Sequence, residues 1–290
     1  MVWSLVVSDP AYTQDRSVFW HPVSGDDLYW ATWYTDGSSV VWVVILLFFY
    51  DLWFILVFTG ASSGIGKACA YYFAQHRHNL ILIARRWDRL QEIKNDLVNL
   101  YKIEILIWIV DVSSYKQVDD FFDWLKDVDI NILINNAWLA KGFDYVSDLS
   151  IDHLNQMIDT NIKGVLYISK KVIPLMIKKG LHIFNIWSIS ANHYYPGGAA
   201  YCATKAAVNS LSQCMRLELQ ASNIMVTCIN PGLVNTQFQY VRTDGDWAQV
   251  DAFLQKRLWT GTQLEPVQIA SLLYDLVGKD IPEISYRHKI

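Results

Sequence analysis

A glycine-rich turn between an apolar run and a helical pattern constrains this fold more than any other stretch of the chain. Residues 53–58 form the apolar run, TGASSGIG follows at 59–66, and a helical pattern covers 65–75. At the start of such a helix, backbone N–H groups and the helix dipole point at an anion, typically a nucleotide diphosphate. Gly66 is expected to let helix and strand pack closely. We expect nucleotide contacts from Gly60, Ser62, Ser63, Gly64, Ile65 and Gly66.

Predicted strands and helices alternate from residue 53 onward, which indicates a parallel sheet with right-handed crossovers. The strands are apolar enough to be buried on both faces. We predict strands at 53–58, 80–84, 103–110, 130–134, a segment ending near 188, 224–229 and the short 283–286, and helices at 65–75, 87–101, 115–126, 151–178, 199–220 and 266–277.

The fold class that follows is α/β, a single doubly wound Rossmann domain over residues 53–290. Its mostly parallel sheet has seven strands, or six if residues 283–286 do not pair. A ligand crevice is expected at the carboxyl ends of the strands. Residues 1–52 are treated as an N-terminal extension of unknown role.

A second motif surrounds Tyr201 and Lys205, which lie four residues apart in the predicted helix and therefore on one face. An ammonium beside a phenol lowers the phenol's pKa from about 10, which suits a general acid or base. Ser188 precedes Tyr201 by thirteen residues at the end of an apolar run, so its hydroxyl can reach the same pocket. Another such pair, Tyr167 and Lys171, lacks the serine and the Pro-Gly-Gly turn, and we interpret it as a surface contact.

Together the two motifs resemble the short-chain dehydrogenase/reductase family over about residues 53–277. The order of the other motifs also matches: Asp-Val at 111–112, Asn-Asn-Ala at 135–137, and PGLVNT at 231–236. Within the family the chain resembles the NADP-dependent dehydrogenases of 3-hydroxy acids, serine and L-allo-threonine. That likeness is carried by ARRWDRL at 84–90, MIDTN at 157–161 and the segment that follows PGLV as far as residue 246.

The cofactor implied by this resemblance is NADP(H). Where NAD enzymes have an acidic residue for the ribose 2′-hydroxyl, this chain has Arg85 and Arg86, which suit a 2′-phosphate. The alternative is a pair of solvated arginines, and Arg89 is interpreted in that way. Family likeness implies further cofactor contacts at Asp111, Val112, Asn136, Ala137, Tyr201, Lys205, Pro231, Gly232, Val234 and Thr236.

The resemblance also implies the catalytic roles. Ser188 would hydrogen-bond the substrate oxygen, Tyr201 would transfer the proton, and Lys205 would hold the ribose hydroxyls and keep Tyr201 poised. Asn161 corresponds to the residue that holds a relay water. The expected substrate is a small hydroxy acid or another secondary alcohol or ketone, with Arg242 binding its carboxylate or, as the alternative, lying solvated on a loop.

Two tryptophans depart from the family pattern. Trp138 stands where glycine follows Asn-Asn-Ala, and Trp187 where a small residue usually precedes the serine. We expect Trp138 to crowd the nicotinamide end, because glycine allows close approach there. Two alternatives to an active hydroxy acid dehydrogenase therefore stand: a weakly active nucleotide-binding scaffold, and a membrane-associated steroid or lipid reductase. The serine–tyrosine–lysine set and Asn161 favour the enzyme, since a scaffold does not need them.

Composition and charge limit the classes of molecule that the chain is expected to bind. A net charge of −4 without a basic run argues against nucleic acid. Four cysteines without metal or disulfide spacing, and scattered histidines, predict no metal site and a cytoplasmic protein. A homo-oligomer, dimer or tetramer, is implied by the family.

The N-terminal extension has two parts. Residues 1–39 show no sustained period, so we expect irregular or weakly ordered structure there. Residues 40–50 are continuously apolar but too short to span a bilayer. We favour packing on the domain or a partner over anchoring at a membrane surface. No basic residue precedes Arg16 and the apolar run starts late, so a secretory signal is not expected.

Overall fold

The computed structural model describes residues 18–22, 29–35, 38–40, 54–256 and 263–286. The chain divides into two units, Met1–Leu52 and Trp53–Ile290, which are described separately. The reading of residues 1–52 as an extension stays a prediction. The apolar segment 40–50 lies outside the described residues, except for Val40.

The expectation of irregular structure over residues 1–39 is wrong for the described part of the first unit. Three antiparallel strands lie there in the order β1-β2-β3, namely β1 Val18–Pro22, β2 Tyr29–Thr35 and β3 Ser38–Val40. β2 is rich in tyrosine, tryptophan and threonine, which favour strands. The overlooked signal is Asp36-Gly37, a strong two-residue hairpin sequence between β2 and β3.

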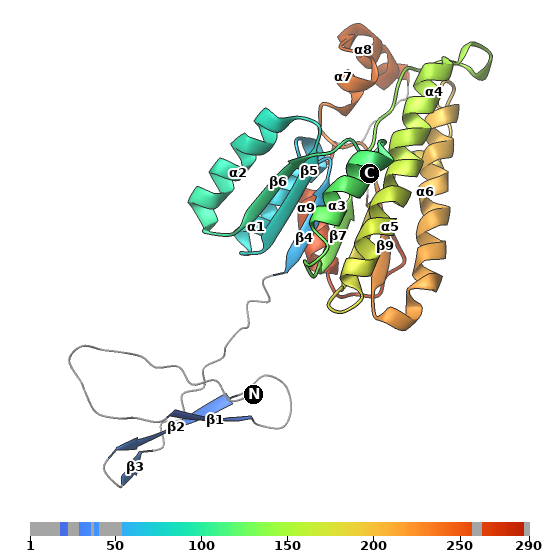
Figure 1. Cartoon of the computed structure of the whole chain (residues 1–290). Coiled ribbons are helices and arrows are strands. Elements are labelled where there is room, and N and C mark those ends of the chain that lie inside the picture. The colour runs from blue at the N-terminus through green and yellow to red at the C-terminus, as the bar shows by residue number, and fades with distance from the viewer. Residues whose placement is uncertain (1–17, 23–28, 36–37, 41–53, 257–262, 287–290) are drawn as a thin grey trace. The chain divides into compact units, whose positions relative to one another are not determined.

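The second unit is built on a parallel seven-stranded sheet, which confirms the predicted fold class (Figure 1). The strand order is β10-β9-β8-β7-β4-β5-β6, and every neighbouring pair is parallel. The short last strand does pair, at the edge beside β9. The strands are β4 Ile55–Thr59, β5 Asn79–Ala84, β6 Ile105–Ile109, β7 Ile132–Asn135, β8 His182–Ile186, β9 Met225–Pro231 and β10 Glu283–Tyr286.

Helices cover both faces of this sheet (Figure 1). Along β4, Leu56 and Phe58 belong to one buried core and Val57 to the other, as the two-residue period of a strand requires. The first core includes residues of α1, α2 and α9, and the second residues of α3, α5 and α6. The helices are α1 Gly64–Gln75, α2 Trp87–Tyr101, α3 Tyr115–Trp124, α4 Ile151–Ile158, α5 Gly164–Met176, α6 Ala199–Glu218, α7 Phe238–Arg242, α8 Trp247–Lys256 and α9 Pro266–Leu276.

The helix predicted over residues 151–178 is interrupted. A π-helical turn, Asp159–Lys163, separates α4 from α5 and contains Asn161. The Asn161 amide binds the backbone of Leu139, in the loop after β7, and donates to the hydroxyl of Thr204 on α6. Such turns are frequent at functional sites. None of the described helices is both long and apolar enough to cross a membrane.

A buried histidine begins β8 and contacts the neighbouring strand β9. His182 is fully buried and stacks on Phe184 with ring centroids 3.8 Å apart. Its Nε2 lies 2.8 Å from the hydroxyl oxygen of Thr227, whose own proton goes to the carbonyl of Ile281. Burial lowers the pKa of His182 from 6.5 to about 3. The imidazole is therefore neutral in the folded chain at pH values where it is charged in the unfolded chain.

We predict that His182 makes the protein sensitive to acid. Below pH 6.5 the unfolded chain takes up a proton that the folded chain refuses until about pH 3. The free energy of unfolding should therefore fall by about 1.4 kcal/mol per pH unit through this group. Urea unfolding at pH 7, 6 and 5 should show a smaller fall for His182→Gln than for the unaltered protein. Equal slopes in the two proteins would contradict the prediction.

Candidate active site

A cavity of about 300 Å³ lies at the carboxyl ends of the strands. Because parallel strands end at the same edge, segments far apart in the sequence meet there. Most residues that the sequence nominated line it: Gly60, Ser62, Ser63, Gly64, Ile65, Arg85, Arg86, Asp111, Val112, Asn136, Ala137, Ser188, Tyr201, Pro231, Gly232, Val234, Thr236 and Arg242. Three nominated residues do not line it: Gly66, Asn161 and Lys205.

The glycine turn is tightly packed beneath the cavity, with no room for side chains at its glycines. Gly60 and Gly64 have φ values of +63° and +55°, which favour glycine. A Cβ on Gly66 would come within 2.5 Å of the Gly60 carbonyl oxygen, so no other residue fits without a backbone shift. The Asn136 amide donates to the carbonyls of Thr59 and Gly60, at 3.0 and 3.3 Å. Gly66 thus packs under the turn, as expected, rather than facing the cavity.

The three arginines behave differently from one another. Arg86 donates to the hydroxyls of Ser62 and Ser63, at 2.8 and 2.7 Å, which holds its guanidinium at the turn. Arg85 is mostly exposed, with an Nη1 3.8 Å from the Asp111 carboxylate. Arg89 donates to the side-chain oxygen of Gln237, at 3.2 Å, in an exposed hydrogen bond, and its interpretation as a solvated arginine stays a prediction. Arg85 and Arg86, but not Arg89, therefore bring positive charge to the cavity lining at the adenosine end of the predicted nucleotide site.

Tyr201 and Ser188 lie together at the opposite end of the cavity. Burial raises the pKa of the Tyr201 phenol, while a hydrogen bond with Ser188 and the charge of Arg242 lower it. Burial prevails, so the phenol is protonated in this structure. The expected lowering by Lys205 is not found. Lys205 is itself buried, which lowers its pKa to about 7, and its Nζ is 5.9 Å from the centre of the Tyr201 ring.

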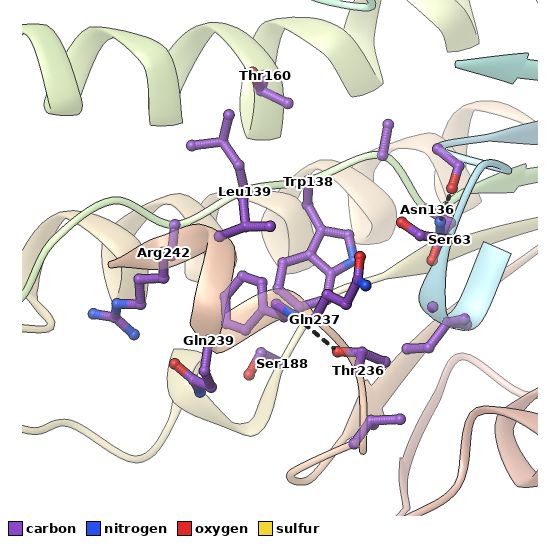
Figure 2. A pocket seen from close by; sticks show the side chains of 18 of the residues that line it. Ser63, Asn136, Trp138, Leu139, Thr160, Ser188, Thr236, Gln237, Gln239 and Arg242 are labelled. Atoms are coloured by element: carbon purple, nitrogen blue, oxygen red, sulfur yellow. Dashed lines mark hydrogen bonds between the residues drawn. The ribbon is translucent and has the colours of Figure 1, made fainter. Parts of the chain in front are cut away.

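Trp138 explains why Lys205 does not reach the cavity. The Lys205 Nζ donates to the Ile186 carbonyl and lies 4.3 Å from the centre of the Trp138 ring. The indole also packs on Phe238 of α7, with ring centroids 4.2 Å apart. Figure 2 shows it projecting into the middle of the cavity. By contrast, Trp187 is almost fully buried in the core that includes α6.

The position of Asn161 bears on its predicted relay role. All three of its side-chain hydrogen bonds go to protein groups, and it does not line the cavity. Its amide instead fixes Leu139, which is on the cavity wall next to Trp138. The relay role stays a prediction.

Arg242 is not a solvated loop arginine, because only 2 % of it is exposed. Its Nε donates to the Gly142 carbonyl and an Nη to the Tyr195 hydroxyl, both at 2.8 Å. The guanidinium lies 3.8 Å from the centre of the Phe143 ring. Sequence reasoning missed the aromatic residues here: Tyr195 precedes the Pro-Gly-Gly turn, but Phe253 on α8 falls where the sequence pattern is weak.

The residues present fit NADP(H) at the adenosine end. The turn leaves no room for side chains at its glycines, and Arg86 brings a fixed cation beside Ser62. At the other end the fit requires Trp138 to leave Lys205, since the indole separates that ammonium from the cavity.

Comparison with known proteins agrees with this geometry. The family model described as short chain dehydrogenase matches residues 55–246. An NADP-dependent 3-hydroxy acid dehydrogenase of Schizosaccharomyces pombe is 38% identical over 68% of this chain and 77% of its own length. Sulfoacetaldehyde reductase 2 of Chromohalobacter salexigens is 34% identical over 76% of this chain and 86% of its own length. A closed form of serine dehydrogenase complexed with NADP+ superposes with a TM-score of 0.71 and 32% identity, covering 80% of this chain and 94% of that one.

We predict that Trp138→Gly strengthens NADPH binding. The substitution removes the indole from Lys205 and abolishes a contact worth about 1 kcal/mol, so the dissociation constant should fall about fivefold. Calorimetric titration measures this without depending on tryptophan fluorescence. Trp124→Phe, at an exposed position on α3, is the control. Weaker binding by Trp138→Gly would mean that the indole is part of the cofactor site.

Proposed function

We propose that this chain, which belongs to the short-chain dehydrogenase family, acts on a short acid in which one carbon atom separates the anionic group from the reacting carbon. It is an NADP-dependent oxidoreductase acting on CH–OH groups, in keeping with the relatives and the NADP-bound structures that it matches. The proposal concerns which alcohol it oxidises, or which carbonyl compound it reduces.

The observation that carries the proposal is the buried cation of Arg242. Only two hydrogen bonds engage it, although a guanidinium has five N–H donors. No carboxylate among the described residues forms an ion pair with it. A buried charge without a counter-ion is costly, and a guanidinium fork matches a carboxylate or similar anion. An anionic substrate would supply the missing partner.

The spacing favours a short substrate. The Arg242 guanidinium carbon lies 5.4 Å from the centre of the Tyr201 ring. An acid held on this arginine, with about one carbon between its anionic group and its reacting carbon, is of a length that brings the reacting carbon close to Tyr201. The named substrates of two relatives, a 3-hydroxy acid and sulfoacetaldehyde, both have that spacing. Carboxylates and sulfonates are thus both compatible with the arginine.

When bound, NADP(H) supplies or accepts the hydride. Ser188 holds the substrate oxygen, and Tyr201 gives that oxygen a proton during reduction or takes one during oxidation. The protonated phenol of this structure is ready for reduction. Oxidation requires the phenolate, which Ser188, Arg242 and an uncovered Lys205 would stabilise. Burial of the set in a low-polarity pocket strengthens each of these interactions.

One observation favours the second candidate, a weakly active nucleotide-binding scaffold: Trp138 covers Lys205. No described residue favours the membrane-associated reductase, whose predicted anchor, 40–50, lies almost wholly outside the described residues. A cytoplasmic homo-oligomer of two or four chains also stays a proposal, supported by likeness to the family alone.

We predict that Tyr201→Phe reduces turnover by about 10²–10⁴-fold, because the ring stays and only the transferable proton is lost. Affinity for NADPH should change by less than about threefold, since the van der Waals surface is retained. The control is Tyr167→Phe, from the other Tyr–Lys pair, which should keep full turnover. A fully active Tyr201→Phe protein would assign proton transfer to another residue.

The substrate proposal is tested at Arg242. Arg242→Gln should raise the Michaelis constant for 3-hydroxybutyrate about 10- to 100-fold, the worth of charge-assisted hydrogen bonds, and leave that for butan-2-ol nearly unchanged. Arg242→Lys keeps the positive charge but loses the forked guanidinium. Its Michaelis constant for 3-hydroxybutyrate should therefore lie between those of the unaltered protein and Arg242→Gln. Arg77→Gln, at an exposed turn, is the control. Equal losses for the acid and the alcohol would overturn the proposal.

A further inference from the structure

Ser190 has a hydroxyl without a hydrogen-bond partner. It belongs to the short helical turn Ile189–Ala191, which Ser188 caps, and only 5% of it is exposed. Each of the other buried serines and threonines in the described part of the chain has a hydrogen-bonded hydroxyl. The Ser190 backbone N–H donates to the Ser188 hydroxyl, at 3.2 Å, but the Ser190 hydroxyl bonds to no described residue. Nothing in the sequence pattern marked this residue.

The Ser190 hydroxyl opens toward the cavity. Ser190 lines the cavity together with Ser188 and Tyr201. Some unpartnered side-chain atoms in the described residues are inaccessible to solvent, among them the Gln239 amide oxygen and the Trp187 indole nitrogen, but the Ser190 oxygen is not one of them. Serine hydroxyls in turns commonly bond to nearby backbone groups, and a buried hydroxyl without any partner costs free energy. The position therefore calls for a hydrogen-bonding group on a ligand.

The proposed function leaves one bond of the reacting carbon without a protein contact. The oxygen on this carbon is held by Ser188 and Tyr201, its hydrogen is the one exchanged with NADP(H), and its third bond leads to the acid on Arg242. The fourth substituent corresponds to carbon 4 of a 3-hydroxy acid. Because the Ser190 N–H is bonded to the Ser188 oxygen, the Ser190 side chain starts beside the group that holds the reacting oxygen. A short fourth substituent is therefore the part of the substrate that the Ser190 hydroxyl can meet.

We infer that Ser190 is a specificity-determining residue that hydrogen-bonds a hydroxyl group on the fourth substituent of the reacting carbon. This inference rests on the proposed function. It narrows the substrate class to 3,4-dihydroxy acids and the corresponding 4-hydroxy-3-oxo acids, in preference to acids with a hydrogen atom or a methyl group at that position. A serine hydroxyl suits another hydroxyl, because each can donate to and accept from the other. A charged group there would require a counter-ion, which a serine cannot supply.

The experiment compares two pairs of alcohols, and the members of each pair differ only in this hydroxyl. The first pair is 3,4-dihydroxybutyrate and 3-hydroxybutyrate, and the second is butane-1,2-diol and butan-2-ol, which lack the acid. The hydride of the reacting carbon passes to NADP+ and the proton of its hydroxyl to the Tyr201 phenolate, which leaves the ketone that is measured. The unaltered protein should show a kcat/KM about tenfold higher for the first member of each pair, the worth of one neutral hydrogen bond.

The variant Ser190→Ala removes the hydroxyl but keeps the backbone N–H that bonds to Ser188. It should lower kcat/KM about tenfold for the two substrates with the extra hydroxyl and change it by less than about threefold for the other two. Ser210→Ala, at an exposed position on α6, is the matched control and should leave all four values unchanged. Calorimetric measurement of NADPH affinity checks that both variants keep the fold.

Several results would overturn the inference. An unaltered protein without preference within either pair would refute it before any variant is made. Equal loss for all four substrates in Ser190→Ala would assign the hydroxyl a structural role. If the uncharged alcohols are oxidised and neither acid is, the proposed function itself fails, and the second pair still tests Ser190. Oxidation of the acids with an unchanged ratio in Ser190→Ala refutes only the role of Ser190.

Discussion

The pairing of β4 with strands on both its sides is the constraint on which the rest of the structure depends. β5 lies on one side and β7 on the other, so the chain leaves β4 toward one half of the sheet and later returns to the other. The connections diverge there and leave a crevice at the carboxyl edge. Asn136, directly after β7, ties that strand to the glycine turn after β4. The cavity thus forms where two halves of one sheet meet.

Removal of water dominates the chemistry inside that crevice. Tyr201, Lys205 and Arg242 are each nearly inaccessible to solvent. Burial raises the pKa of the phenol and lowers that of the ammonium, which is opposite to what their mutual attraction would do. The spacing of Tyr201 and Lys205 in the sequence indicates that the two side chains are neighbours, but it contains no information on how accessible the site is to water. Charged ligands in the cavity would favour the ionised forms, the Tyr201 phenolate and the Lys205 ammonium.

The fold could be predicted from the sequence because its signals are local. Apolar runs, helical periods and the glycine turn were enough to predict every strand from β4 to β10 in order, and even the short β10 pairs as expected. The helices α7 and α8 were not predicted, because the pattern weakens after Thr236. The π-helical turn at Asn161 was missed because it depends on hydrogen bonds to Leu139 and Thr204, distant in the sequence. The same holds for the indole over Lys205 and for the Gln239 side-chain oxygen, which has no hydrogen-bond partner among the described residues. Both depend on side-chain directions that no one-dimensional pattern specifies.

The contact between Trp138 and Phe238 connects the two ends of the cavity. Phe238 begins α7, the helix that ends at Arg242, while Trp138 covers Lys205. A nucleotide that displaces the indole therefore also removes a packing partner from the helix that holds the anion site. If bound nucleotide changes the affinity for the acid by some factor, thermodynamic reciprocity requires that bound acid changes the affinity for the nucleotide by the same factor. The contact between these two aromatic rings is thus the physical link through which the nucleotide half-site and the anion half-site would influence each other.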